Sequence, residues 1–201
     1  MERHEAIVRI QQLEGQDLVA IAHQYNVTVW KNGKLNKGWC GHTIERHLGL
    51  PLNSSQSPNF GSWELKVVPL KRINGKLVPK ETMAITMIDE VNVRDASFED
   101  SHLLAKMQKI LIVAREFESK EEKHSTLVDV AQFDLTDINI INQVRADYEL
   151  VQSTIKTLGY TSLTGKMGVL IQPRTKGPGH GSTSRAFYAR KGFVKTILDL
   201  K

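Results

Sequence analysis

The chain has 201 residues, 40% hydrophobic and 24% charged, which fits a single globular domain and excludes disordered and fibrous proteins. Its single cysteine, Cys40, excludes an intramolecular disulfide and any zinc site built on paired thiolates, so we expect it to pack as a small apolar residue. The net charge of +5 is too small to identify a partner by itself, and its distribution along the chain says more.

The first 50 residues are predicted to form a helical lobe. Apolar residues at helical spacing predict a helix over residues 5–13, which Gly15 ends. Asp17 is a candidate N-cap for a second helix over residues 17–25. The turn-rich stretch KNGKLNKG then leads to a third helix over residues 39–48, followed by a polar loop.

The middle of the chain alternates between strand and helix patterns. A strand is predicted over residues 63–68, with a hairpin turn at Asn74-Gly75 and a return strand over residues 81–88. A helix over residues 101–109 runs into a buried strand over residues 110–114. The charge run REFESKEEKH is predicted to be solvated, and STLVDVAQF to form another strand.

The last third contains the longest predicted helix, over residues 137–158. Its apolar face is expected to consist of Ile138, Ile141, Val144, Tyr148, Val151 and Ile155. Then follow a strand (166–173), a glycine-rich loop (175–184), a short segment (185–191) and a final helix (193–200). The pattern predicts one α/β domain over residues 1–201, with a helical lobe at about 1–50 and a mixed sheet and basic part at about 57–201.

Positive charge collects at the C-terminal end. From Tyr160 onward, eight lysines and arginines face a single acidic residue, Asp199, which favours a polyanionic partner such as DNA. The N-terminus MERHEAIVRI is charged from its second residue, and no apolar run approaches the length of a membrane span. We therefore expect a cytoplasmic protein with no membrane partner.

The stretch SPNFGSWELKVVPLK carries the first candidate chemistry. Side chains two apart on a strand share a face, so Glu64 and Lys66 are expected to lie together. With a second acidic group from a preceding turn, they could hold Mg²⁺ or Mn²⁺ and place a water for attack on a phosphodiester. Taken alone, the tripeptide ELK is more often structural than catalytic, because alternating charges on an exposed strand are commonplace.

Four longer blocks are more specific. KGWCGHTIERHLGL, SPNFGSWELKVVPLKRINGKLVPKET, FEDSHLLAKMQKILIV and QPRTKGPGHGSTSRAFYARKGF span about residues 37–193. In order and approximate spacing they resemble the MutH-like endonucleases, which comprise MutH, the strand-nicking enzyme of mismatch repair, and related type II restriction endonucleases. The resemblance implies the PD-(D/E)xK fold, a mixed central sheet flanked by helices, and hydrolysis of DNA.

The resemblance also implies roles for individual residues. Glu64 and Lys66 match the acidic residue and the lysine of the central strand, and the backbone carbonyl of Leu65 would be a further metal ligand. Glu45 matches a helix glutamate that reaches the metal site, and Lys106 matches an additional active-site lysine. Without the family pattern, Glu45 and Lys106 would be read as surface charges.

Asn59 departs from the family pattern. It precedes Glu64 at the spacing at which MvaI-type enzymes have the aspartate that first binds the metal, and Ser57 stands at the longer spacing of MutH. An amide offers Mg²⁺ a neutral oxygen and no charge, so impaired cleavage is expected. Three explanations remain open: an introduced Asp→Asn change, a naturally attenuated relative, or another acidic residue in the role.

The basic C-terminal part is predicted to contact DNA. Glycines in TKGPGHGSTSR let backbone N–H groups approach a phosphate, and the resemblance makes this a recognition loop. The predicted DNA-binding residues are Gln172, Arg174, Lys176, His180, Ser182, Thr183, Arg185 and Tyr188. Gln172 stands where MutH has an arginine implicated in recognition, which argues against the same target sequence. Trp30, Trp39 and Phe187 are predicted to be core residues.

These expectations combine into a sequence-specific, Mg²⁺-dependent endodeoxyribonuclease of the type II restriction class, impaired by Asn59 and acting on double-stranded DNA as a monomer. The nearest alternative is a MutH-type nickase of mismatch repair, for which MutL would be a partner. A second alternative is a non-catalytic DNA-binding domain that kept the nuclease fold.

Overall fold

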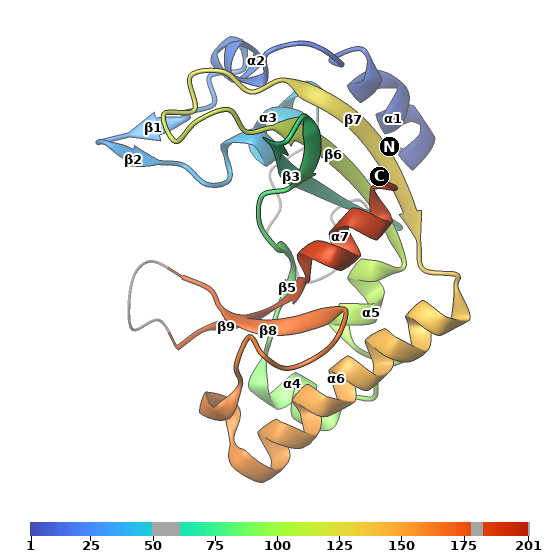
Figure 1. Ribbon diagram of the computed structural model, residues 1–201. Helices are drawn as coiled ribbons and strands as arrows, with labels where there is room; N and C mark the ends of the chain where they lie inside the picture. Colours follow the sequence, from blue (N-terminus) through green and yellow to red (C-terminus); the bar gives the residue numbers. More distant parts are fainter. Residues whose placement is uncertain (50–60, 178–182, 201) are drawn as a thin grey trace.

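The computed structural model describes residues 1–49, 61–177 and 183–200. Figure 1 shows three N-terminal helices over one sheet, with a second sheet and the longest helix at the opposite end of the molecule. In chain order the elements are α1 Arg3–Gln11, α2 Leu18–Gln24, β1 Trp30–Lys31, β2 Lys34–Leu35, α3 Trp39–His47, β3 Glu64–Ile73, β4 Lys76–Pro79, β5 Met83–Met87, α4 Glu90–Asp95, α5 His102–Met107, β6 Lys109–Glu116, β7 Leu127–Asp134, α6 Ile138–Leu158, the 3-10 helix η1 Tyr160–Ser162, β8 Ile171–Thr175, β9 Arg185–Ala189 and α7 Lys191–Ile197.

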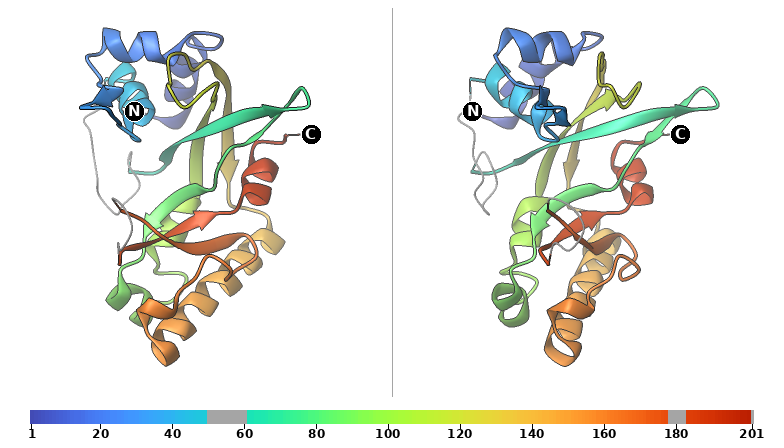
Figure 2. Two further views of the ribbon diagram at one scale, coloured as in Figure 1. Left: turned by 60° about the vertical axis from the view of Figure 1, so that its left-hand side comes forward. Right: turned by 90° about the vertical axis from the view of Figure 1, so that its left-hand side faces the viewer.

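Two sheets organise the chain. The larger has the order β4-β3-β6-β7, in which β3 and β6 run parallel and the other neighbours antiparallel. The smaller is antiparallel, in the order β5-β9-β8. The strands of both sheets can be followed in the turned views of Figure 2. The α/β class, the mixed central sheet and the helical N-terminal lobe are confirmed.

Alternate residues of β3 face two different cores. Leu65 packs with the N-terminal helices, whereas Val68 packs with the second sheet and the C-terminal helices. Glu64 and Lys66 have the same parity as Val68, so they share the face directed at the second sheet. This alternation determines where the candidate chemistry lies.

The local signals for helices and turns hold in the structure. Asp17 caps α2, because its carboxylate accepts a hydrogen bond from the Val19 N–H at 3.0 Å. The turn at Asn74-Gly75 has both residues at positive φ, 49° and 78°, which suits a tight two-residue hairpin. Cys40 and Trp39 are buried in the N-terminal core as expected, and burial raises the pKa of the Cys40 thiol to about 12.

The strand predicted over residues 81–88 is present as β5, but its predicted pairing with β3 was wrong. The strand that returns along β3 is β4, which starts directly after the two-residue turn, whereas β5 pairs with β9 in the other sheet. The strand predicted over residues 166–173 is also shorter. It begins at Ile171, where the Asp147 carboxylate accepts hydrogen bonds from the backbone N–H groups of residues 169, 170 and 171.

The charge run REFESKEEKH, which starts in the last two residues of β6, was predicted to be solvated, and this was wrong for two of its members. Arg115 and Glu122 are 8% and 3% exposed and form a two-pronged ion pair, with N–O distances of 2.7 and 2.9 Å. Ser125 also accepts a hydrogen bond from Arg115 at 2.8 Å. Burial without pairing would be costly for either charge, so the pair holds this loop against the N-terminal core.

Two apolar predictions need correction. Trp30 is 42% exposed rather than a core residue, and Ile138, in the first turn of α6, is 62% exposed. The other residues of the predicted α6 face from Val144 to Ile155 are buried, as is Phe187. No helix in the described part of the chain is both long and apolar enough to cross a membrane.

Candidate active site in a basic cleft

Glu64 is the centre of a cluster of charged side chains. It opens β3, and only 2% of its surface is exposed. The Lys66 Nζ donates a hydrogen bond to the Glu64 Oε1 at 2.7 Å and a second to the Ile85 carbonyl at 3.0 Å. The Ile85 contact connects the active strand of the larger sheet with β5 of the smaller one.

A second lysine reaches the same oxygen. Ser101 caps α5 by accepting the Leu104 N–H, and the helix then carries Lys106 inward to 6% exposure. Its Nζ lies 3.3 Å from the Glu64 Oε1. Two ammonium groups therefore converge on one buried carboxylate, and both had been picked out in the sequence.

Glu45 supplies a second carboxyl group from α3. It is 8% exposed, and both burial and the nearby charge of Glu64 raise its pKa. The effect of Glu64 on this pKa means that the two carboxyl groups interact, although α3 and β3 belong to different parts of the fold. The four predicted residues Glu45, Glu64, Lys66 and Lys106 are thus brought together.

Lys176 joins this cluster electrostatically. Burial lowers the pKa of Lys66, and the positive charges of Lys106 and Lys176 lower it further. The Glu64 carboxylate acts in the opposite direction and raises it. Burial and the charge of Lys106 also lower the pKa of Lys176 itself. The sequence placed Lys176 among the DNA-binding residues, and it lies within electrostatic range of the two central lysines as well.

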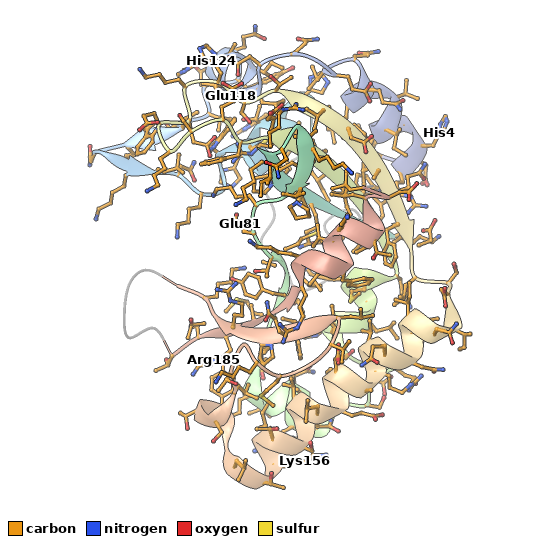
Figure 3. All side chains as sticks on the ribbon, viewed as in Figure 1. His4, Glu81, Glu118, His124, Lys156 and Arg185 are labelled. Atoms are coloured by element: carbon orange, nitrogen blue, oxygen red, sulfur yellow. The ribbon has the colours of Figure 1, made fainter. Side chains whose placement is uncertain are left out.

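A cleft of about 650 Å³ opens beside the cluster. It runs between the start of α3, the β3 edge and the second sheet, and Figure 3 shows Glu81 between the two halves of the molecule. Its lining residues are Lys37, Gly38, Lys66, Val67, Val68, Pro69, Glu81, Thr82, Met83, Ala84, Arg174, Thr175, Lys176 and Tyr188. Four of them are cationic and one is acidic, so the cleft favours a polyanion.

The β8–β9 hairpin forms one wall of the cleft. Arg174 donates a hydrogen bond to the Thr82 hydroxyl at 3.0 Å, and its guanidinium carbon lies 5.8 Å from the centre of the Tyr188 ring. Burial raises the pKa of Tyr188. Pairing of Arg174 with Ala186 and of Gln172 with Tyr188 places these side chains on one face of the hairpin.

The remaining predicted DNA-binding residues are dispersed. Gln172 is only 5% exposed and lies beneath Gly165, so a contact with DNA would require that turn to move. Arg185, labelled in Figure 3, donates to the Thr183 carbonyl at 3.0 Å and faces the Tyr160 ring at 5.8 Å. Neither Arg185 nor Thr183 lines the cleft.

Three predicted site residues, Asn59, His180 and Ser182, lie outside the described residues. Leu65 is buried beside Leu111, and its carbonyl remains a predicted metal ligand. Within residues 1–49, 61–177 and 183–200, no three His, Cys, Asp or Glu side chains gather as a complete metal site. The described carboxyl groups of the cluster are those of Glu45 and Glu64.

The cleft residues that sequence reasoning missed include Lys37, Glu81 and Thr82. Lys37 had a usable signal, because it opens the block KGWCGHTIERHLGL that also contains Glu45. Glu81 and Thr82 had been absorbed into the wrongly placed return strand, which hid their position at the junction of the two sheets.

Comparison with protein families gives two overlapping matches. Residues 48–147 match the family described as DNA mismatch repair enzyme MutH, and residues 9–84 match the MvaI/BcnI restriction endonuclease family. The second match includes Glu45, Glu64 and Lys66, and the first includes Glu64, Lys66 and Lys106.

Full-length relatives and a solved structure extend the comparison. The DNA mismatch repair protein MutH of Haemophilus ducreyi is 28% identical, over 97% of this chain and 92% of its own. MutH of Vibrio cholerae is 26% identical, over 97% and 88%. A complex of the restriction endonuclease MvaI with its cognate DNA substrate aligns over 92% of this chain and 97% of that one, with 11% identity and a TM-score of 0.37.

Proposed function

We propose that this chain, which matches the MutH and MvaI/BcnI family models over residues 48–147 and 9–84, is a MutH-like endonuclease that cleaves double-stranded DNA at a specific sequence with a divalent metal ion. The observation that carries the proposal is the convergence of Lys66 and Lys106 on the buried Glu64 carboxylate at the wall of a basic cleft. An ordinary strand with surface charges would expose such residues to solvent.

The carboxyl groups of the cluster fit a hard divalent cation such as Mg²⁺ or Mn²⁺. Glu64 and Glu45 offer carboxylate oxygens, the ligands these ions prefer, and their mutual repulsion would be relieved by a cation between them. The Leu65 carbonyl and the side chain at position 59 would complete the site. When bound, the ion would neutralise charge that builds on the phosphate and make a bound water more acidic.

The lysines have a separate role in the proposal. Lys66 would hold the attacking water by a hydrogen bond, and its lowered pKa would ease proton exchange with that water. Lys106 would keep the Glu64 carboxylate oriented and contribute positive charge near the scissile phosphate. Glu45 would orient the same water or metal from the α3 side.

The cleft supports the choice of DNA as substrate. Arg174 and Lys176 would contact phosphates, and Tyr188 would lie against the duplex on the same hairpin face. His180, Ser182, Thr183, Arg185 and Gln172 are proposed as further contacts of the recognition hairpin. Since both halves of the molecule line the cleft, we propose that residues 1–201 act as one nuclease domain and as a monomer on DNA.

Within the family we propose the type II restriction class. Its support is the spacing of Asn59 before Glu64, which resembles that of MvaI-type enzymes, together with the MvaI/BcnI match over residues 9–84. A second candidate, a mismatch-repair nickase that responds to MutL, is supported by the MutH relatives that align along 97% of the chain. Cleavage of one strand at a hemimethylated site, stimulated by MutL, would favour the nickase.

The test is cleavage of a plasmid library in Mg²⁺ by the protein and by its Asn59→Asp variant. We expect Asn59→Asp to cut at a defined site, and Lys66→Gln in that background to lose most of this cutting. The ends of the fragments would then reveal the target and distinguish double-strand cutting from nicking. If the protein and its variants bound DNA specifically but none of them cleaved it, the proposed nuclease activity would be refuted. A DNA-binding domain of nuclease fold would then be favoured.

A further inference from the structure

The β1–β2 hairpin carries a pair of lysines in an unfavourable arrangement. Lys31 and Lys34 pair directly across the hairpin, so their side chains lie on the same face. Like charges in this position destabilise a hairpin. Within the described ranges neither lysine forms a salt bridge with a carboxylate, so their repulsion is not offset there.

The hairpin is nevertheless firmly built. Its turn residues, Asn32 and Gly33, have φ values of 50° and 71°, the pair that a tight two-residue turn requires. The Trp30 indole N–H donates to the Glu121 carbonyl at 2.9 Å. Glu122, the next residue, is held by the buried ion pair with Arg115, so the base of the hairpin is tied to the core.

The position of the hairpin relates the two lysines to the cleft. The chain leaves β2 and reaches Lys37, which lines the cleft, within two residues of Leu35. Figures 1 and 2 show the β1–β2 hairpin projecting on the same side of the molecule as the free ends of β8 and β9. The two hairpins therefore flank the basic cleft from opposite halves.

We propose that the β1–β2 hairpin is a second DNA-binding arm, whose Lys31 and Lys34 contact the phosphate backbone of the duplex that enters the cleft. The proposal rests on the proposed function, since it takes DNA as the occupant of the cleft. A phosphate between the two ammonium groups relieves their repulsion, and two such contacts release counterions on binding. The contact is to phosphate and carries no sequence preference.

The inference can be tested without knowing the target sequence. Binding of a fluorescent duplex of random sequence is measured in metal-free buffer across a series of KCl concentrations. The Lys31→Gln/Lys34→Gln variant should weaken binding and reduce the slope of log K against log salt by about 2, because each phosphate contact contributes about 0.9. A Lys31→Arg/Lys34→Arg variant should keep the wild-type slope.

Lys109→Gln/Lys156→Gln is the matched control, since it removes the same charge from surfaces away from the cleft lining. Its slope should stay at the wild-type value. The hairpin variant should also unfold at the same temperature as the wild type or a higher one without DNA, because a like-charge pair has been removed. A lower melting temperature would contradict the strained pair on which the proposal rests.

Two different results would refute the proposal that the β1–β2 hairpin binds DNA, and they can be told apart. If the slope is unchanged in Lys31→Gln/Lys34→Gln but falls in Arg174→Gln/Lys176→Gln, DNA occupies the cleft without touching this hairpin. The proposed function then stands and the arm fails. If the wild-type protein binds no duplex, the proposed function and the arm fail together.

Discussion

Burial and the nearby charge of Glu64 together raise the pKa of Glu45, so two carboxyl groups held by β3 and α3 interact across the site. In the sequence, α3 precedes and β3 follows residues 50–60, which lie outside the described residues. The protonation of Glu45 therefore depends on the charge of Glu64.

Glu45→Gln should therefore alter the pH dependence of stability. A carboxyl whose pKa is raised on folding contributes stability below its ordinary pKa of 4.5, and that contribution is lost as pH rises through the raised pKa. We expect the variant to melt at a higher temperature than the wild type at neutral pH, and this difference to shrink as pH falls through the raised pKa of Glu45 toward 4.5. Thermal unfolding across this range measures it.

The control for this experiment is Glu149→Gln, which changes an exposed carboxyl on α6. It should shift the melting temperature equally at both ends of the pH range. If Glu45→Gln changed the melting temperature by the same amount at both ends of the pH range, ionisation of Glu45 would not destabilise the folded protein.

Lys66→Gln should separate catalysis from binding. In an active Asn59→Asp background we expect the rate of cleavage to fall about 10²- to 10⁴-fold, the range for loss of a positioned proton-transfer group. Affinity for the target duplex should change little. Lys71→Gln, on the same strand but outside the cleft lining, is the matched control, and an equal loss of rate there would contradict a specific role for Lys66.

Arg115→Met should strongly destabilise the protein. It leaves the Glu122 carboxylate buried without its partner, a change that typically costs about 3–5 kcal/mol. Arg72→Met removes an equally well-formed ion pair, with Glu116, from an arginine that is 52% exposed, and should have a much smaller effect. Urea unfolding of both variants gives the comparison, and similar losses would refute the importance of burial.

Gly168→Ala should be far more damaging than Gly165→Ala. Gly168 has a φ of 76°, and a Cβ there would overlap the Ile171 carbonyl oxygen, whereas a Cβ at Gly165 would meet Arg174 at an ordinary 3.5 Å. We expect the first change to cost more than about 2 kcal/mol and to weaken DNA binding through displacement of β8. Equal melting temperatures for the two variants would disprove this.

The sequence was informative wherever the determining physics is local. A side-chain cap at Asp17 and a tight turn at Asn74-Gly75 depend on a few neighbouring residues, and both are confirmed. The partner of β5 depends on β9, which arrives from the far end of the chain, so sequence adjacency suggested the wrong hairpin. The burial of Arg115 with Glu122 likewise follows from how a loop folds back onto the core.

For the site, the family pattern singled out Glu45, Glu64, Lys66 and Lys106, and the structure places them together. Their roles remain predictions. The pattern gave no warning that Lys176 affects the pKa of Lys66, because that effect depends on where the end of β8 lies relative to β3.

Among the residues that the structure describes, β3 has a strand partner on only one side over the first part of its length. β6 accompanies the strand from Glu64 to Leu70, but β4 pairs with it only from Leu70 onward. Open edges are templates for aggregation, which natural proteins suppress with proline and inward-pointing lysine. Pro69 and Lys66 occupy those positions here. Apolar replacement of Lys66 would remove this protection, so inactive forms for preparing DNA complexes are better made with polar substitutions.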